Sequence, residues 1–560
     1  MSQRLRQSMI LRENISQVIV GHVLNRYGSD VDYANNILMA VKQLLSANIQ
    51  YYNLPQTIDT VGYSKECPED NLQEALSKIN EKESRQRKDG VYYTDSDVTD
   101  FLAANTLLHY VSSAERGVYG LKKTQKKIDN LSICQKERIV RATTLDPTCG
   151  AGEFLLSVLS IKIHLIKHLK GLKYEVLADS IFGNDIDIQS TEITKLRLFF
   201  LLIDSFEGVL SVNEIADRLN RNFTNVDAVE YDKLTFSSKD IVIGNPPYVE
   251  YRNFSGTPQL GYGNVYADVL HHSMDTLVSD GIMAFVIPLS YISTIRMSKI
   301  REYISNKSEK QIIMNFADRP DSLFSCVHQK LSIMIAQKTS ILKGVFSSSY
   351  QYWYQSERQT LFDNISLEPT FTDNKAFWPK VGNLNEVNLY KKFLKLEGND
   401  LLSYKNQESP GSLYVNQRGC FWMKAFTKDM QSNSYVEYKV PKNILPFVFC
   451  LVNSSLFFLL WIIISDGWHI TNKELSFIKI PSKINKLPVW ESLMVRLEDK
   501  LEKTKVYVGT TQVDYEYKHK ECKDIIDEID EELAAVYHLS ETQLNYVKNF
   551  GLKYRLSNGA

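Results

Sequence analysis

The sequence predicts an α/β protein in which buried strands alternate with helices. Three apolar runs support this prediction: the first leads into a glycine-rich turn, the second ends in acidic residues and the third ends in Asn-Pro-Pro-Tyr. They are residues 139–145, 181–183 and 241–244. Short apolar runs that alternate with helical stretches are typical of parallel strands linked by helices. The carboxyl ends of such strands meet at one edge of the sheet, where ligands bind.

The first run leads into the turn 146–152, Asp-Pro-Thr-Cys-Gly-Ala-Gly, and then into a helical pattern. Gly150 and Gly152 lack a Cβ, so a ligand can approach the backbone and the first N–H groups of the helix. The turn has an acid at its head and no Lys-Ser/Thr, so it does not suit a phosphate. An acid suits the cationic amino-acid group of S-adenosylmethionine. We therefore expect cofactor contacts from Asp146, Thr148, Gly150 and Gly152.

Cys149 lies within the same turn and raises the alternative of a cysteine nucleophile. A nucleophilic thiol needs an adjacent base, and no histidine is near in the sequence. We expect a small residue that lines the wall of the site.

The second run ends at Asn184-Asp185-Ile186-Asp187. A carboxylate one βαβ step beyond a glycine turn is where a ribose diol is usually held, which makes Asp185 the candidate for that role and Ile186 its neighbour in the site. Asp227 follows a weaker element and is a candidate contact to the amino group of the cofactor's adenine. A solvated loop acid is the alternative for Asp227.

The third run ends at Asn245-Pro246-Pro247-Tyr248, which indicates a reaction as well as a turn. Two prolines fix φ and supply no N–H donors, so the turn is rigid and its carbonyls are free to accept. The side-chain oxygen of Asn245 and the carbonyl of Pro246 can converge on one exocyclic amino group and make its nitrogen more nucleophilic. Tyr248 offers a flat face for a base. The alternative is an ordinary turn that ends a strand.

Further upstream, Gly90-Val91-Tyr92-Tyr93-Thr94 precedes a helical pattern. Taken in order, this segment, the glycine turn, Asp185-Ile186-Asp187 and Asn245-Pro246-Pro247-Tyr248 resemble the gamma-class (TaqI-like) N6-adenine DNA methyltransferases of type II restriction-modification systems. The resemblance extends from residue 90 to about residue 340. One departure is Asp95, where the family commonly has proline.

The resemblance implies a Rossmann-like, S-adenosylmethionine-dependent fold with a mixed seven-stranded sheet. It also implies that Tyr93 and Thr94 contact the cofactor and that Asn245, Pro246 and Tyr248 act on an adenine rotated out of duplex DNA. The family has a second aromatic residue opposite the tyrosine. Tyr291, Phe316 and Phe324 are candidates for it, although each also suits the core.

The chain has 560 residues, which exceeds one domain because single cores stop growing at about 250–300 residues. We expect an N-terminal helical region over 1–88, the catalytic domain over 89–345, an α+β target-recognition domain over 346–490 and a helical segment over 491–560. The helical segment is expected to bury Ile525, Ile526, Ile529, Leu533 and Val536 on one face.

The net charge of −1 gives no overall signature of nucleic-acid binding, although cations can still gather in one cleft. The seven cysteines form no Cys-x-x-Cys pair, so we expect neither a metal site nor a disulfide framework. Reduced thiols and the lack of a signal-peptide pattern indicate the cytoplasm of a bacterium or archaeon.

The C-terminal half contains the apolar segment 444–464, which Pro446 and Asn453 to Ser455 interrupt. These residues make a membrane span a poor interpretation, and a buried strand followed by a helix is expected instead. The next segment, residues 465–470, resembles segments near the C-terminus of many restriction-modification methyltransferases. Candidate DNA contacts in this half are Arg418, Trp422, Lys424, Trp468 and His469.

These features predict a methyltransferase that acts on N6 of adenine in double-stranded DNA, without a metal. The alternatives are a glutamine-type protein methyltransferase, which is usually shorter, and a non-catalytic recognition subunit, in which the motifs would have decayed. Enzymes that methylate N4 of cytosine generally have a Ser-Pro-Pro turn in place of Asn-Pro-Pro, so adenine is favoured here. The N-terminal region has no strand-borne Asp followed by Glu-x-Lys, so a fused nuclease is not expected there. A separate cognate restriction endonuclease is left open.

Overall fold

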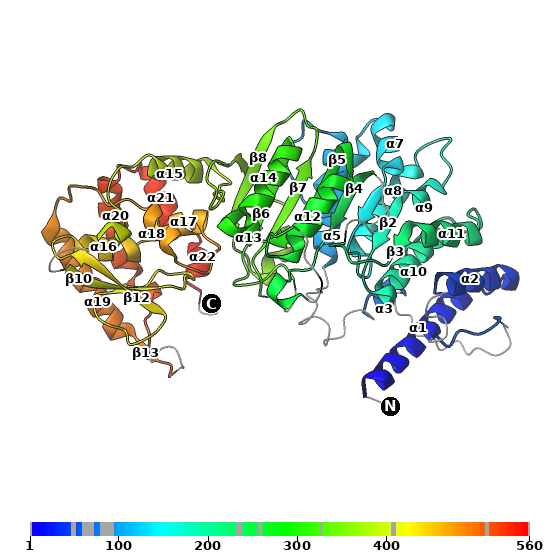
Figure 1. Cartoon of the computed structure of the whole chain (residues 1–560), viewed down its shortest axis with the longest axis horizontal. Coiled ribbons are helices and arrows are strands. Elements are labelled where there is room, and N and C mark those ends of the chain that lie inside the picture. Colours follow the sequence, from blue (N-terminus) through cyan, green and yellow to red (C-terminus); the bar gives the residue numbers. More distant parts are fainter. Residues whose placement is uncertain are drawn as a thin grey trace.

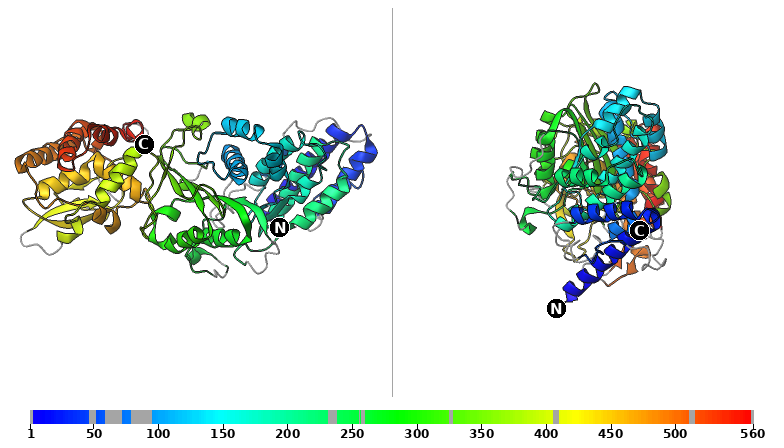
Figure 2. Two further views of the ribbon diagram at one scale, coloured as in Figure 1. Left: turned by 90° about the horizontal axis from the view of Figure 1, so that it is seen from above. Right: turned by 90° about the vertical axis from the view of Figure 1, so that its right-hand side faces the viewer.

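The structure is a computed structural model that describes residues 3–45, 52–58, 72–78, 95–230, 238–254, 256, 260–324, 328–404, 410–509 and 515–557, with side chains from Ile15 onward. The molecule is elongated (Figures 1 and 2). N-terminal helices lie at one end, a large sheet with its helices lies in the middle, and a C-terminal unit of helices and short strands lies at the other end.

Among the described residues, a nine-stranded mixed sheet forms the centre of the molecule, in the order β3-β2-β1-β4-β5-β7-β6-β8-β9. Strands β1 to β5 pair in parallel, whereas β7 is antiparallel to both of its neighbours. The strands are β1 (Thr144–Asp146), β2 (Ile181–Asn184), β3 (Phe223–Thr224), β4 (Lys239–Gly244), β5 (Leu277–Pro288), β6 (Lys310–Phe316), β7 (Leu331–Gln337), β8 (Gly344–Gln351) and β9 (Leu367–Pro369).

The expected count of seven strands is therefore too low by the last two, and the sheet continues past the domain boundary expected at residue 345. Strand β8 escaped the sequence analysis because its buried face is polar. Ser347 and Ser348 are fully buried, and the side-chain amide of Asn315 on β6 donates to the Ser347 hydroxyl and to the Ser348 carbonyl, both at 3.0 Å. In β8, hydrogen bonds between buried polar side chains take the place of apolar contacts, so the sequence lacks the apolar run that would predict a buried strand.

Helices cover both faces of the sheet. Alternate side chains of β4 point to opposite faces, so Ile241 and Ile243 join one core while Val242 joins the other. One core is shared with α5 (Ser96–Val111), α7 (Ile133–Arg141), α8 (Glu153–Ile166), α10 (Ile188–Ser205) and α11 (Val212–Asn222); the other with α12 (Val265–Thr276) and α14 (Ser298–Lys307) (Figure 1). Burial on both faces explains why these strands are continuously apolar.

The first strand is shorter than expected. Ile139 and Val140 lie at the end of helix α7, and β1 begins only at Thr144. A capping box between Ser132 and Gln135 starts that helix, which therefore takes up the apolar pair that the sequence analysis assigned to the strand.

The N-terminal helices α1 (Gln3–Tyr27) and α2 (Val31–Leu44) confirm the helical patterns expected there, and α3 (Leu72–Lys78) follows. They pack against the α10–α11 side of the sheet domain. Arg26 donates to the Asp204 carbonyl at 2.9 Å, and the Tyr27 hydroxyl donates to the Asp204 carboxylate. This region is therefore joined to the sheet domain, the half of the molecule that is expected to be catalytic and is called the catalytic half below.

The C-terminal unit holds a three-stranded antiparallel sheet and a group of helices around one core. This core includes Leu289, Ala317 and Tyr350 of the sheet domain as well as residues from Phe377 to Val547, so it joins the two segments expected to divide at residue 490. Helix α20 buries Ile525, Ile526, Ile529 and Leu533, as expected. The elements are α15 (Leu384–Leu394), β10 (Pro410–Asn416), β11 (Ala425–Phe426), β12 (Tyr435–Pro441), α16 (Leu445–Asn453), α17 (Ser455–Ile464), α18 (Asn472–Phe477), α19 (Leu487–Thr504), α20 (Lys523–Val536), α21 (Glu541–Asn549) and α22 (Leu552–Arg555).

Residues 444–464 form two helices, so the strand expected in the first half of this segment is wrong. Pro446 is accommodated in the first turn of α16, and the Ser454 hydroxyl caps α17 by accepting from the Phe457 N–H. Within the described ranges, no single helix has the length and apolar composition to cross a membrane; α16 and α17 reach that measure only as a pair bent by 62°.

Candidate active site

The glycine turn and the Asn-Pro-Pro-Tyr turn lie side by side at one edge of the sheet. Strands β1 and β4 pair in parallel, with Leu145 opposite Val242, so the turns that follow them begin at the same level. The Thr148 hydroxyl donates to the Asn245 carbonyl at 3.5 Å. Chain order changes direction between β1 and β4, and ligands of open α/β sheets bind at such a switch point.

The two glycines of the first turn serve different purposes. Both have positive φ, +51° at Gly150 and +85° at Gly152. A Cβ on Gly152 would lie 2.6 Å from the Thr194 methyl carbon, whereas a Cβ on Gly150 would meet no described residue within 4 Å. Gly152 is thus required for helix packing, and the side of Gly150 is open to a ligand.

Asp185 links the glycine turn to the next strand. Its carboxylate accepts from the Gly150 N–H and from the Asp187 N–H, both at 2.9 Å. The neighbouring Ile186 side chain is 69% exposed, which leaves an apolar surface beside the half-buried carboxylate. A carboxylate next to an apolar surface fits a ribose carrying a flat base.

Asp146 lies beneath the turn. The residue is 1% exposed, and its Oδ1 accepts from the Thr148 N–H at 3.0 Å. Burial raises the pKa of this carboxyl well above its usual value, and the nearby Asp185 carboxylate adds to the rise. A Cβ on Gly244 would lie 2.6 Å from Asp146 Oδ1, so the glycine that precedes Asn245 makes room for the acid. Asp146 therefore supports both turns from a buried position, through its hydrogen bond to Thr148 and its close approach to Gly244.

Cys149 and Asp227 are both held within the site. Cys149 is 5% exposed, and burial raises the pKa of its thiol well above the usual value, which suits the expected wall residue. The Asp227 carboxylate accepts from the Val229 N–H at 3.1 Å.

Asn184 is a site residue that the sequence analysis missed. It is fully buried at the end of β2, and its side-chain amide donates to the Pro147 carbonyl at 3.0 Å and to the Val226 carbonyl at 2.9 Å. It thereby fixes the loop of Asp227 against the glycine turn. The available signal was a polar residue at a strand position directly before Asp185.

Tyr93 and Thr94 lie outside the described residues. The next residue, Asp95, which replaces the proline common in the family, pairs with Arg358 at 3.1 Å. Arg358 also contacts the Asp97 carboxylate and donates to the Leu323 carbonyl at 2.8 Å. The start of α5 is therefore tethered to the segment that follows β8.

The Asn-Pro-Pro-Tyr turn holds its acceptors in one place. Pro246 is buried, while Asn245 and Tyr248 are half-buried. The Tyr248 hydroxyl donates to the Asn245 side-chain oxygen at 2.5 Å and lies 3.1 Å from the Val286 carbonyl oxygen. An amide oxygen has two lone pairs, and this bond engages one of them and orients the Asn245 side chain.

A cavity of about 400 Å³ opens beside Tyr248 and is closed on its far side by the C-terminal unit. The three aromatic candidates for a second base contact, Tyr291, Phe316 and Phe324, are at most 1% exposed. Trp468 lines the cavity together with Tyr248. The lining includes Tyr248, Glu250, Asn264, Pro288, Arg296, Asp318, Arg319, His328, Lys330, Asp466 and Trp468.

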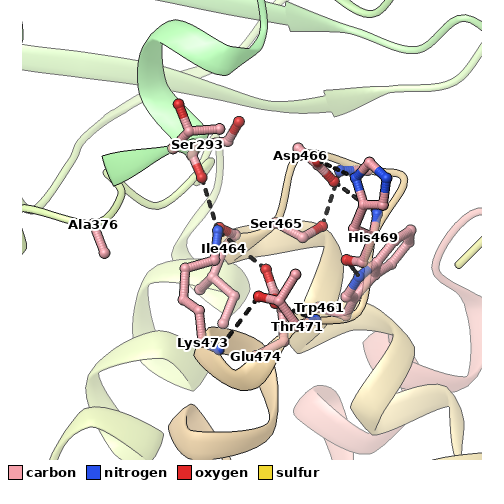
Figure 3. A network of polar contacts seen from close by, with 12 residues as sticks. Ser293, Ala376, Trp461, Ile464, Ser465, Asp466, His469, Thr471, Lys473 and Glu474 are labelled. Atoms are coloured by element: carbon pink, nitrogen blue, oxygen red, sulfur yellow. Dashed lines mark hydrogen bonds and ion pairs between the residues drawn. The ribbon is translucent and has the colours of Figure 1, made fainter. Parts of the chain in front are cut away.

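The loop that carries Trp468 is fixed by a polar network (Figure 3). One Asp466 oxygen accepts from the Trp468 and His469 N–H groups, both at 2.8 Å, and the other contacts the His469 ring nitrogen at 2.8 Å. Lys473 donates to the Ser293 carbonyl of the catalytic half at 2.7 Å. The network thus connects the C-terminal unit to the catalytic half.

The candidate DNA contacts fall into two groups. Arg418 and His469 are exposed and form an antiparallel bridge, and Trp468 lies between His469 and the cavity. Trp422 instead donates to the Arg555 carbonyl at 3.1 Å, with the guanidinium of Arg555 4.1 Å from its ring centre. Lys424 is partly buried, which lowers its pKa. The structure brings the first group together and gives the second packing roles.

Comparison with known proteins places the site in context. Residues 179–324 match the family described as Eco57I restriction-modification methylase. Over 154 residues the chain is 29% identical to a putative type II restriction enzyme and methyltransferase of Methanocaldococcus jannaschii, RM.MjaORFECS2P. The matched stretch is 22% of this chain and only 13% of that protein.

Two solved structures extend over nearly the whole chain. The Type IIL restriction-modification enzyme MmeI bound to DNA has 13% identity and a TM-score of 0.49, covering 98% of this chain and 94% of that one. The type IIG restriction endonuclease BpuSI has 13% identity and a TM-score of 0.42, covering 99% and 77%. Both sequence matches are to restriction-modification methyltransferases over part of this chain, and the methylase family supports S-adenosylmethionine as the cofactor.

Proposed function

We propose that this protein is a site-specific DNA methyltransferase that modifies N6 of an adenine rotated out of duplex DNA. It would serve as the modification enzyme of a restriction-modification system in the cytoplasm, with or without a separate cognate endonuclease. The observation that supports this most directly is the contact between Thr148 and Asn245, which joins the glycine turn to the acceptor turn. Methyl transfer requires a donor site and an acceptor site within one bond-forming distance.

The residues present fit S-adenosylmethionine, which supplies an electrophilic methyl group on a sulfonium. The Asp185 carboxylate would hold the ribose, and the exposed Ile186 would cover the adenine of the cofactor. Asp227 would accept from that adenine's amino group, and Tyr93 and Thr94 would complete the site. Gly150 gives the cofactor access to the backbone, while Thr148, Gly152 and the buried Asp146 keep the turn in shape.

Catalysis would come from positioning and charge placement. The Asn245 side-chain oxygen and the Pro246 carbonyl would accept from the two N–H groups of the target amine, which concentrates its lone pair on N6. Tyr248 orients Asn245 and offers its ring to the extruded base. No base has to ionise N6 first, because the nitrogen becomes cationic and strongly acidic once the methyl group has been transferred. The cost of extruding the base, a few kcal/mol, would be met by DNA contacts.

DNA contacts would come from both sides of the cavity. Arg418, Trp468 and His469 lie on the C-terminal unit close to the cavity, whereas Trp422 and Lys424 would support the same surface from within. A shared cavity between the catalytic half and the C-terminal unit suits a duplex held between the two.

A methyl-acceptor assay tests the proposal. Purified protein would be incubated with radiolabelled S-adenosylmethionine and mixed-sequence duplex DNA, a protein lysate or cytosine-only acceptors. Label in adenine N6, at one sequence context in single-molecule sequencing, is the expected result. Label in protein side chains or in cytosine would contradict it, as would DNA binding without any transfer.

A further inference from the structure

The ring of Trp468 is contacted by two cations of the catalytic half. The Arg319 guanidinium lies 5.3 Å from the ring centre and the Lys330 ammonium lies 4.6 Å from it. Arg319 and Lys330 flank the loop between β6 and β7, whereas Trp468 belongs to the C-terminal unit. All three residues line the same cavity. An aromatic ring from one half of the molecule therefore holds cations from the other half at the cavity wall.

The two cations differ in how their charge is balanced. Lys330 pairs with Asp318 at 3.0 Å, and both side chains are largely buried, at 13% and 6% exposed. Arg319 is exposed, and within the described ranges it forms no ion pair with a carboxylate. Lys330 is thus a structural cation, whereas the charge of Arg319 is left for a ligand.

The same comparison extends to the rest of the cavity lining. Arg296 pairs with Glu250 at 3.0 Å, and Asp466 is engaged by His469 at 2.8 Å. Arg296 and His328 are the other exposed basic side chains among the described residues of the lining. Of the permanently charged cations around this cavity, Arg319 is therefore the one that the described part of the chain leaves without a carboxylate partner.

The main chain that carries the Trp468 ring is fixed by hydrogen bonds on both sides. The main-chain N–H of Trp468 donates to Asp466 at 2.8 Å, and its main-chain carbonyl accepts from the Gly419 N–H at 2.9 Å. Gly467, with φ of +71°, lies so close to Lys330 that a Cβ would be 3.1 Å from the lysine Cδ. A guanidinium that is attracted to a ring face does not use its N–H donors in that contact, so they can bind a phosphate.

We propose that Arg319, held over the Trp468 ring, binds a backbone phosphate of the DNA strand that carries the target base, at the mouth of the cavity beside Tyr248. This inference rests on the proposed function. Arg319 would then grip the strand where the nucleotide leaves the duplex, and would act only when the C-terminal unit is seated against the catalytic half. Arg319 is accordingly a binding residue, and the chemistry remains with Asn245.

The test measures DNA binding, separately from methyl transfer. Fluorescence anisotropy with a labelled mixed-sequence 30-base-pair duplex would be followed across a range of KCl concentrations for the full chain. Arg319→Ala should weaken binding roughly five- to tenfold at low salt and lower the slope of log K against log salt by about one. Arg319→Lys should retain the slope while binding more weakly than wild type, because charge is kept and the planar fork is lost.

Two further variants control for non-specific effects. Arg141→Ala removes an exposed arginine of α7 that is paired with Glu137 at 2.9 Å, and it should leave slope and affinity unchanged. In a protein that already carries Trp468→Leu, adding Arg319→Ala should weaken DNA binding very little further, since the ring orients the guanidinium. Thermal unfolding and cofactor binding should be unchanged in Arg319→Ala.

The outcomes separate the two proposals. A wild-type protein that methylates DNA while Arg319→Ala keeps the wild-type salt slope would overturn the Arg319 assignment alone. Additive effects of Arg319→Ala and Trp468→Leu would overturn the role given to the ring. Absence of DNA binding and methylation by wild type would reject the proposed function and the phosphate contact together.

Discussion

Two units of the molecule meet at the cavity, and they are built in different ways. We call the sheet domain the catalytic wall and the C-terminal unit the C-terminal wall. On the catalytic wall, Gly150 and Asp185 are positioned by main-chain hydrogen bonds at the ends of parallel strands. On the C-terminal wall, Trp422 and Arg555 hold each other through side-chain packing and a single hydrogen bond. A substitution on the first wall should therefore act on catalysis or on cofactor binding, whereas one on the second wall should act on DNA binding or on stability.

The largest expected effect is that of Asn245→Ala. Removing the side-chain acceptor should lower turnover by about 10²–10³-fold, because transition-state charge placement is lost. Binding of DNA and S-adenosylmethionine should stay near wild type, since Tyr248 keeps its contact with the Val286 carbonyl. Asn245→Asp, which keeps an acceptor oxygen, should retain measurable turnover. Normal single-turnover rates for Asn245→Ala would remove the difference between the two walls.

The next effect concerns pH on the C-terminal side. Asp530 accepts from the Ser455 and Leu456 N–H groups at the start of α17, and burial raises its pKa to about 6. Its folded pKa exceeds the unfolded value, so the stabilisation is complete below about pH 4 and is lost as the pH rises through 6. The loss is at most about 3 kcal/mol.

Asp530→Asn isolates this contribution, because the amide keeps an acceptor and cannot ionise. Denaturant unfolding should show the variant gaining stability relative to wild type as the pH rises from 4 to 7. A difference between the two proteins that does not change with pH would show that Asp530 ionises normally.

A smaller effect is expected from Gly150→Ala, with Gly171→Ala as the matched control. Both glycines have positive φ, and in the described part of the chain nothing lies within 4 Å of a Cβ built on either. Both variants should lose about 1 kcal/mol of stability from left-handed strain. Calorimetry should show about tenfold weaker S-adenosylmethionine binding, or about 1.4 kcal/mol, for Gly150→Ala alone. Equal affinities would place the cofactor away from this turn.

The smallest effects should separate Arg418 from Trp422. Arg418→Ala should weaken DNA binding a few-fold and lower the salt slope by about one, without changing the melting temperature. Trp422→Phe loses the hydrogen bond to the Arg555 carbonyl, so it should cost about 1 kcal/mol of stability with little change in affinity per folded molecule. The reverse pattern, measured by anisotropy and calorimetry, would exchange the two roles.

The catalytic wall could be predicted because its residues are local to strand ends. Once three strands are placed in one parallel sheet, the glycine turn, Asp185 and Asn245 must meet at the same edge, and the pairing of β1 with β4 brings them there. Asn184 could not be assigned from the sequence, because its role depends on carbonyls contributed by two other loops.

The C-terminal wall was less predictable because its residues act across long sequence distances. The partner of Trp422 is Arg555, and the ring of Trp468 meets Arg319. Composition also gave wrong elements in two places. Strand β8 is buried although it carries serine side chains, and a serine cap divides the apolar segment 444–464 into two helices. In each case a hydrogen bond replaced the apolar pattern on which the prediction relied.

The bond from Lys473 to the Ser293 carbonyl, with Gly467 seated on Lys330, bears on any attempt to graft a new sequence specificity onto this protein. A chimaera cut at residue 346 would divide strand β8, and one cut at 490 would split a core. A chimaera should therefore keep residues 465–473 of this protein, because they hold the C-terminal unit against the catalytic half, and a foreign recognition module should be joined outside them.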